Sequence, residues 1–212
     1  MRQYGGVPSS LTRGDVAPPD EEGVRDGLHY ALFLPSGAPR GGVVALHGAD
    51  SRKENHYDWC RECRAAGLAA VVFDQRGHGA SRGPMDGRFL DDVATIAGVL
   101  PAGPLALRGS SMGGFLAIAA AQRAGADAVV AICPAVGRLL LGGIRSGRFA
   151  FGADAAALAP ILEGTDLDAA ADALADRLLL MHATGDDTVP VSHSDALHAA
   201  APRSRYVRVP GG

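Results

Sequence analysis

Residues 108–117 have the sequence RGSSMGGFLA, a cluster of small residues between an apolar run and an alanine-rich segment. Three interpretations compete for it: a loop that cradles phosphate, a packing turn, and a turn that presents a serine for chemistry. A P-loop needs G-x-x-x-x-G-K-[ST], and no lysine follows Gly113 or Gly114. The dinucleotide fingerprint G-x-G-x-x-G also fails, because Ser111 stands where its second glycine belongs. The stretch does contain G-x-S-x-G, centred on Ser111.

The flanking sequence favours the serine interpretation. PLALR (104–108) is strand-like, and FLAIAAAQRAG (115–125) is helix-like. A strand, a sharp turn and a helix form the context in which G-x-S-x-G makes a nucleophile elbow. Such a turn holds its central residue in strained backbone geometry, and only very small residues at 109 and 113 avoid collision. A packing turn at a strand–helix junction stays open as the alternative.

Composition excludes several classes of protein. The 212 residues are 47% hydrophobic and 20% charged, with a formal net charge of −3, which is typical of one globular domain or two small ones. No cluster of Lys and Arg is concentrated enough to predict a nucleic-acid partner. No apolar run approaches the ~20 residues that span a bilayer, and the first residues lack the apolar core of a signal peptide. We therefore expect a cytoplasmic protein without a membrane span.

The three cysteines fit that compartment, because an odd, small number makes no disulfide framework. Cys60 and Cys63 form C-x-x-C, which occurs in redox and zinc sites but here has no second pair or histidine cluster beside it. The spacing also places both thiols on one helical face, and we interpret them as packing residues. Cys133 ends an apolar run and is interpreted as a small buried hydrophobe.

Short apolar runs recur along the chain, and helical patterns lie between them. The runs occupy 28–34, 42–46, 69–74, 104–108, 127–133, 177–182 and 205–209. The central runs are continuous, as in strands that are buried on both faces. This alternation predicts an α/β fold with a mostly parallel sheet covered by helices on both sides. Capping-box spacing at Ser51 and Glu54, and again at Ser192 and Asp195, predicts two helix starts.

Two segments depart from this rhythm. Residues 1–27 are rich in Gly, Pro and charge, and we expect an irregular lead-in to an edge hairpin that turns at Asp26–Gly27. Residues 28–212 then form the α/β domain. Within it, 134–176 has no clear strand but many Leu, Ala and Phe residues, which predicts a small helical lid near the carboxyl ends of the strands.

Four stretches in family order resemble the α/β-hydrolase superfamily: LHGAD (46–50), FDQRGHGAS (73–81), GSSMGG (109–114) and MHATGDDTVP (181–190). The resemblance covers roughly residues 28–212, and the serine aminopeptidase-like and small-esterase branches are most similar. It implies that Ser111 is the nucleophile and that the N–H groups of Ala49 and Met112 form the oxyanion hole. It also implies that Asp74, Arg76 and His78 build a structural loop near the site.

The resemblance selects an acid as well. Enzymes of this fold run Ser…Asp/Glu…His along the chain. Aligning the family pattern His-Gly-x-x-Asp-x-x-Val-Pro on His182 selects Asp186, while Asp187 falls on a variable position and is expected to cap the next helix or face water. Ala183 replaces the usual glycine, which leaves the alignment intact.

The catalytic base is not apparent among the seven histidines. Only His193 and His198 follow Asp186, whereas the family's base comes from the loop after the last strand, here RYVRV (205–209). We expect this base a few residues past Gly212. Because the strands are parallel, Gly212 should lie within about 10–12 Å of Ser111, a reach of roughly three extended residues, and His193 should not hydrogen-bond to that serine. Two alternatives stay open: His193 substitutes as the base, or the fold is a non-catalytic binding module.

The implied reaction is hydrolysis of a carboxylic ester through a Ser-Asp-His triad and an acyl-enzyme. Amide or peptide, thioester and acyl-transfer chemistry are related possibilities. The expected partner is a small acyl substrate, and the sequence predicts neither a metal nor an organic cofactor.

Overall fold

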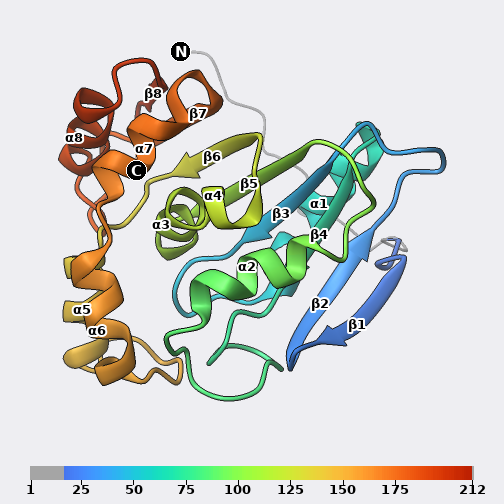
Figure 1. The fold of residues 1–212 in the computed structure, drawn as a ribbon, viewed down its shortest axis with the longest axis horizontal. Coiled ribbons are helices and arrows are strands. Elements are labelled where there is room, and N and C mark those ends of the chain that lie inside the picture. Colours follow the sequence, from blue (N-terminus) through green and yellow to red (C-terminus); the bar gives the residue numbers. More distant parts are fainter. Residues whose placement is uncertain (1–16, 212) are drawn as a thin grey trace, which may run out of the picture.

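The computed structural model describes residues 17–211, which form one eight-stranded sheet flanked by helices (Figure 1). Its order is β1-β2-β4-β3-β5-β6-β7-β8, with β1 and β2 antiparallel to their neighbours and the other strands parallel. The strands are β1 (Glu21–Arg25), β2 (Leu28–Phe33), β3 (Gly42–Leu46), β4 (Ala69–Phe73), β5 (Leu105–Ser110), β6 (Ala128–Ile132), β7 (Leu178–Ala183) and β8 (Arg205–Val209).

Helices cover both faces of the sheet. They are η1 (Lys53–His56), α1 (Tyr57–Ala65), α2 (Phe89–Ala97), α3 (Met112–Ala119), α4 (Ala121–Ala124), α5 (Gly137–Arg145), α6 (Ala155–Gly164), α7 (Leu167–Leu174), η2 (Ala175–Arg177) and α8 (Ser192–Ala200). One apolar core lies beneath α2, α3, α7 and α8, and a smaller one packs α1 against the opposite face. The α/β fold with a mostly parallel, doubly covered sheet is confirmed.

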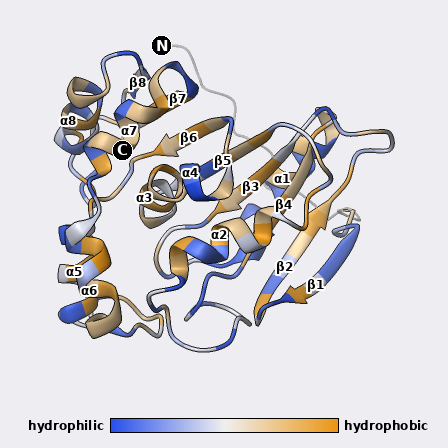
Figure 2. Cartoon of the chain, viewed as in Figure 1, coloured by the Kyte–Doolittle hydropathy of each residue, from blue (hydrophilic) through white to orange (hydrophobic). Residues whose placement is uncertain are grey.

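All seven predicted strands are present, because continuous apolar runs are stable only where both faces of a strand are buried. Strands β3 and β4 are buried at every position. The hairpin turn is confirmed too: Asp26 and Gly27 have φ of 50° and 77°, and Arg25 pairs with Leu28. The outer strand β1 is largely hydrophilic (Figure 2), as an exposed sheet edge requires.

Helices begin at both places where the capping-box spacing predicted them, but the capping boxes themselves do not form. Helix η1 follows Arg52 and α8 follows Val191, and neither start has a side-chain cap. The hydroxyl of Ser51 instead accepts a hydrogen bond from the Asn55 side chain. Asp195 binds residues of β8 rather than the start of its own helix. The Ser51 side chain pairs with another side chain of the same turn, and that of Asp195 pairs with a neighbouring strand, so neither one caps its helix.

The segment 134–176 is helical, but its helices divide into two groups. Helices α5 and α6 pack on each other beyond the carboxyl ends of the strands (Figure 1). Helix α7 packs against α3 and α8 in the layer that covers the sheet. Only α5 and α6 therefore occupy the place where we expected a lid. No helix in the described residues is both long and apolar enough to cross a membrane.

Candidate active site

Ser111 lies at the turn between β5 and α3 and has a left-handed backbone, with φ 53° and ψ −118°. The turn is closed by glycines. A Cβ on Gly109 would collide with the carbonyl of Gly113, and a Cβ on Gly113 would collide with the carbonyl of Leu46. A non-glycine residue persists at positive φ only where its surroundings hold it there. This is the geometry of a nucleophile elbow, and it presents the Ser111 side chain at the carboxyl edge of the sheet.

The loop after β3 borders the same serine. A Cβ placed on Gly48 would lie 3.5 Å from the Cβ of Ser111. Within residues 17–211, the backbone N–H groups of Ala49 and Met112 donate no hydrogen bond to another protein group. Unpaired N–H groups beside a nucleophile are available to an oxyanion. Of the two predicted oxyanion residues, Met112 directly follows Ser111, and Ala49 follows Gly48, which borders that serine.

His47 fixes this loop to its neighbour. Its Nε2 accepts a hydrogen bond from the backbone N–H of Gln75, its Nδ1 donates to the carbonyl of Gly48, and the Gln75 side-chain amide donates to the carbonyl of His47. Burial is the main reason why the pKa of His47 falls to about 4. The imidazole is therefore neutral at physiological pH, as this pattern of one donor and one acceptor requires.

Asp186 lies in the loop after β7. Its Oδ1 accepts backbone hydrogen bonds of 2.9 Å from Thr188 and 2.8 Å from Val189. Burial opposes ionisation, but these amides, the Cys133 thiol and the nearby His182 hold the pKa of Asp186 below its ordinary value. The side chain is an oriented carboxylate at neutral pH.

Asp187 is exposed, and its carboxylate accepts only a bond from the hydroxyl of Thr188. It caps no helix and faces water, which was one of the two outcomes expected for it. The structure therefore separates the two neighbouring aspartates, since only Asp186 is held by backbone amides.

His182 is buried, and it hydrogen-bonds to the loop after β7 that carries Asp186, here called the acid loop. Its Nε2 donates to the carbonyl of Val189 at 2.8 Å, and its Nδ1 lies 2.7 Å from the hydroxyl of Ser194. The carbonyl can only accept, so Nε2 carries the proton. Both ring nitrogens of His182 are therefore engaged in contacts that hold the acid loop.

Strand order brings these parts together. Ser111 follows β5 and Asp186 follows β7, with β6 between them. Neighbouring strands are about 4.8 Å apart, so the two positions are separated by about 10 Å across the sheet. Cys133, which follows β6, occupies the intervening place.

Cys133 is not the buried hydrophobe that the sequence predicted. It is half-buried, has a left-handed φ of 44°, and its Sγ lies within 4.8 Å of the Asp186 carboxylate. The signal that points to this residue is its place at the carboxyl end of a parallel strand, where ligands of α/β sheets bind.

The chain returns to the acid loop after β8. The amide of Thr184 donates to the carbonyl of Val209, and the amide of Gly185 donates to that of Gly211 at 2.7 Å. Gly212, on which the expected distance to Ser111 depended, lies outside the described residues. Among the described residues the His193 side chain is not hydrogen-bonded to Ser111, as expected, and its buried Nδ1 has no hydrogen-bond partner.

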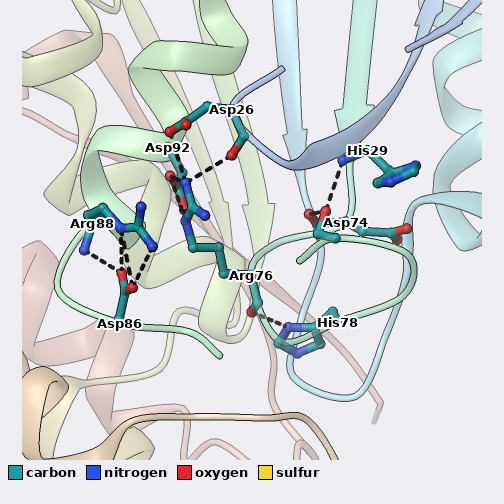
Figure 3. Close-up of polar contacts among 9 residues, drawn as sticks. Asp26, His29, Asp74, Arg76, His78, Asp86, Arg88 and Asp92 are labelled. Carbon is teal, nitrogen blue, oxygen red and sulfur yellow. Dashed lines mark hydrogen bonds and ion pairs between the residues drawn. The ribbon is translucent and has the colours of Figure 1, made fainter. Parts of the chain in front are cut away.

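The loop 74–81 is structural, as the resemblance implied (Figure 3). The Asp74 carboxylate accepts the backbone amides of Lys53 and Ala80. Arg76 is buried against Asp92 in a two-pronged ion pair and also reaches Asp26.

The remaining member of that loop, His78, donates from Nδ1 to the carbonyl of Arg76 and stacks on Phe151 with ring centroids 4.0 Å apart. None of its contacts reaches Ser111. It therefore joins the loop to the segment between α5 and α6.

Cys60 and Cys63 are buried on α1 among the apolar residues of the smaller core. Burial is the main cause that raises the pKa of Cys60 to about 12 and that of Cys63 to about 11. Such thiols are unreactive at neutral pH. Packing, not redox or metal chemistry, explains this C-x-x-C.

One group of side chains in the described residues has the proximity of metal ligands: Cys133, His182 and Asp186, with donor atoms within 4.8 Å of one another. A metal would need a free ring nitrogen on His182. Both nitrogens are engaged, and Nε2 carries a proton that it donates to a carbonyl. The arrangement suits a hydrogen-bonded acid loop and not a metal site.

This fold, with a strained serine between β5 and α3 and a held aspartate after β7, defines an α/β hydrolase. The family described as "Serine aminopeptidase, S33" matches residues 37–149, and the chain belongs to that family of esterase- and lipase-like serine hydrolases.

Known proteins agree with this placement. A monoacylglycerol lipase of Mycolicibacterium smegmatis is 32% identical over 123 residues, which cover 54% of this chain and 43% of the lipase. The chain therefore matches less than half the length of that relative. Est1E from Butyrivibrio proteoclasticus, solved with ferulic acid, has a TM-score of 0.73 at 18% identity and covers 90% of this chain and 89% of its own. A Paleococcus ferrophilus monoacylglycerol lipase has a TM-score of 0.69 at 19% identity, covering 87% and 89%.

Proposed function

We propose that the protein hydrolyses a carboxylic ester, with Ser111 as nucleophile, Asp186 as the acid that orients a histidine, and the amides of Ala49 and Met112 as the oxyanion hole. The observation that carries this proposal is the left-handed Ser111 with two unpaired N–H groups beside it. A packing turn has no physical need for free donors aimed at the same place as a strained serine.

The catalytic histidine, in this proposal, follows residue 212. The hydrogen bond between Gly185 and Gly211 supports it, since it places Gly211, the last described residue, beside the acid loop. Within residues 17–211 no histidine is hydrogen-bonded to Ser111, and His182 is engaged elsewhere.

The reaction then proceeds in two balanced steps. The histidine accepts the Ser111 proton as Oγ attacks the ester carbonyl, and the amides of Ala49 and Met112 bind the negative oxygen. Collapse expels the alcohol, which takes the proton from the imidazolium and leaves an acyl-enzyme. Water, deprotonated by the same histidine, releases the carboxylic acid and restores the serine. Asp186 keeps the imidazole in the correct tautomer and stabilises its charged form.

The substrate class is a small uncharged ester. The matched relatives include two monoacylglycerol lipases and an esterase solved with ferulic acid. The apolar residues of α5 and α6, beyond the carboxyl ends of the strands, favour an aliphatic or aromatic acyl group. These two helices would act as the lid.

The test is a panel of p-nitrophenyl esters of graded acyl length, with a matching anilide and thioester. We expect the ester of each matched set to be hydrolysed fastest. Saturable binding of the esters without turnover, by a chain that includes the residues encoded after Gly212, would instead favour a non-catalytic binding module. That second candidate rests on the absence of a histidine bonded to Ser111 in the described residues.

A further inference from the structure

Cys133 is the residue whose geometry the proposed mechanism leaves unexplained. It follows β6, the strand between those that carry Ser111 and Asp186. Its φ of 44° lies in the left-handed region, which a cysteine rarely adopts without support from its surroundings. The support is visible: the Cys133 amide donates a 2.8 Å hydrogen bond to the carbonyl of Met181 in β7.

This backbone conformation places the thiol beside the acid. Sγ and a carboxylate oxygen of Asp186 lie within 4.8 Å of one another, together with a ring nitrogen of His182. The backbone amides of Thr188 and Val189 already hold Oδ1 of Asp186. The thiol is therefore a third group that borders this carboxylate, and it comes from a different strand.

We propose that Cys133 is a positioning residue for Asp186: its thiol borders the carboxylate from the β6 side and keeps it oriented toward the catalytic histidine. The proposal rests on the proposed function for its catalytic consequence, but the contact itself is independent of any turnover. This role would explain why Cys133, at the carboxyl end of strand β6, has a left-handed backbone.

The pKa shifts of Cys133 and Asp186 are both consistent with this contact. Burial is the main cause that raises the pKa of the Cys133 thiol; the backbone of Ala183 opposes it, and the facing Asp186 raises the pKa further, while the thiol helps to lower the pKa of Asp186. The titratable side chains that face the thiol are Asp186 from the acid loop and His182 from β7. Both ring nitrogens of His182 are already paired, with the carbonyl of Val189 and the hydroxyl of Ser194, so Asp186 is the facing group whose charge can be removed to test the contact.

The contact predicts how Cys133 reacts with iodoacetamide as a function of pH, measured for the Cys133 peptide by mass spectrometry. In Asp186→Asn the facing charge is gone, so we expect the midpoint of the alkylation curve to move to lower pH, with a rate about 3–10-fold higher near pH 8. The plateau rate at high pH should stay the same, because it reports access and not ionisation. The control is Asp187→Asn, which should leave the curve within twofold of wild type.

An unchanged midpoint in Asp186→Asn overturns the proposal, as does a change confined to the plateau. This measurement needs no catalysis, so it decides the contact even if the protein hydrolyses no ester.

The catalytic consequence is tested in the chain that includes the residues encoded after Gly212. Cys133→Ala should lower kcat about 3–10-fold and move the acid limb of the kcat/KM profile to higher pH, because a more basic Asp186 stabilises the imidazolium. Cys133→Ser, which restores a donor, should return kcat to within about threefold. Equal losses in both variants with an unshifted pH profile would overturn the positioning role. Activity at the wild-type level in Cys133→Ala would do the same.

Discussion

The carbonyl of Gly211 accepts a 2.7 Å hydrogen bond from the amide of Gly185, the residue that precedes Asp186. The bond lies just beyond Ala183 and Val209, the last pair of the parallel strands β7 and β8. It ties the end of the described chain to the loop that holds the acid. A histidine one to three residues further on needs only a short span to lie between Asp186 and Ser111.

The first prediction follows from this bond. The 212-residue chain should hydrolyse p-nitrophenyl acetate at a rate at least about 10³-fold below that of a longer chain with a histidine after Gly212, because the proposed mechanism places the general base there. Steady-state rates of the two chains provide the measurement. Equal rates would show that the base lies within these 212 residues, and His193→Ala would then identify or exclude His193.

The second prediction concerns the nucleophile. Ser111→Ala should lower kcat by about 10⁴–10⁶-fold, the range observed when the nucleophile of a triad is lost. A fluorophosphonate probe should label Ser111 in the active chain. The matched control is Ser110→Ala, which removes the neighbouring hydroxyl from the end of β5 and should retain labelling. Labelling that survives Ser111→Ala would disprove the assignment.

The third prediction separates the two aspartates. Asp186→Asn should cost about 10³–10⁴-fold in kcat, because the histidine loses the partner that orients its tautomer. Asp187→Asn should cost less than about tenfold, since its carboxylate faces water. Thermal unfolding of both variants checks that the loss is catalytic and not structural. The reverse order of the two losses would move the acid by one residue.

The fourth prediction concerns the elbow glycines. Gly113→Ala should lower the free energy of unfolding by about 3 kcal/mol, because its Cβ would collide with the carbonyl of Leu46. Gly142→Ala is the control: this glycine lies within α5 with no atom near an added Cβ. That change should be neutral or stabilise the protein by up to about 1 kcal/mol. Urea unfolding at pH 7 measures both, and equal effects would contradict the close approach seen here.

The fifth prediction concerns acid sensitivity. Burial, with the charge of Arg108, lowers the pKa of His56 to about 4, and burial lowers that of His47 similarly. An unfolded histidine titrates near 6.5, so between about pH 6.5 and 4 the unfolded chain binds protons that the folded chain does not. The free energy of unfolding should therefore fall as the pH drops through this window.

His56→Gln tests that cause, since Gln stays neutral and keeps an acceptor for Arg108. It should reduce the loss of stability between pH 6.5 and 5 by about 1 kcal/mol, a value already lowered because His56 is only partly buried. His29→Gln, at a half-exposed position in β2, serves as the control. Parallel pH profiles of wild type and His56→Gln would contradict this explanation.

Local patterns in the sequence were sufficient for the strands, the edge hairpin and the elbow. Apolar runs such as 42–46 and 69–74 report burial on both faces, and that burial is what makes β3 and β4 central. G-x-S-x-G between a strand and a helix predicted the turn at Ser111, because few backbones satisfy those steric limits. The capping boxes are absent because other partners are available: the Ser51 hydroxyl accepts from the Asn55 side chain, and Asp195 pairs with Tyr206 of β8.

The sequence by itself therefore determined the α/β class, the order of the elements and the residue types at the elbow and acid loop. These depend on periodicity and on steric limits over a few neighbouring residues. Only the tertiary structure decided that Cys133 lies beside Asp186 and that His182 hydrogen-bonds to Val189 and Ser194. It also decided that the carbonyl of Gly211 accepts the amide of Gly185. Those contacts join residues on different strands. The order in which β5, β6, β7 and β8 pair is set by the packing of the whole sheet, and no short stretch of sequence contains it.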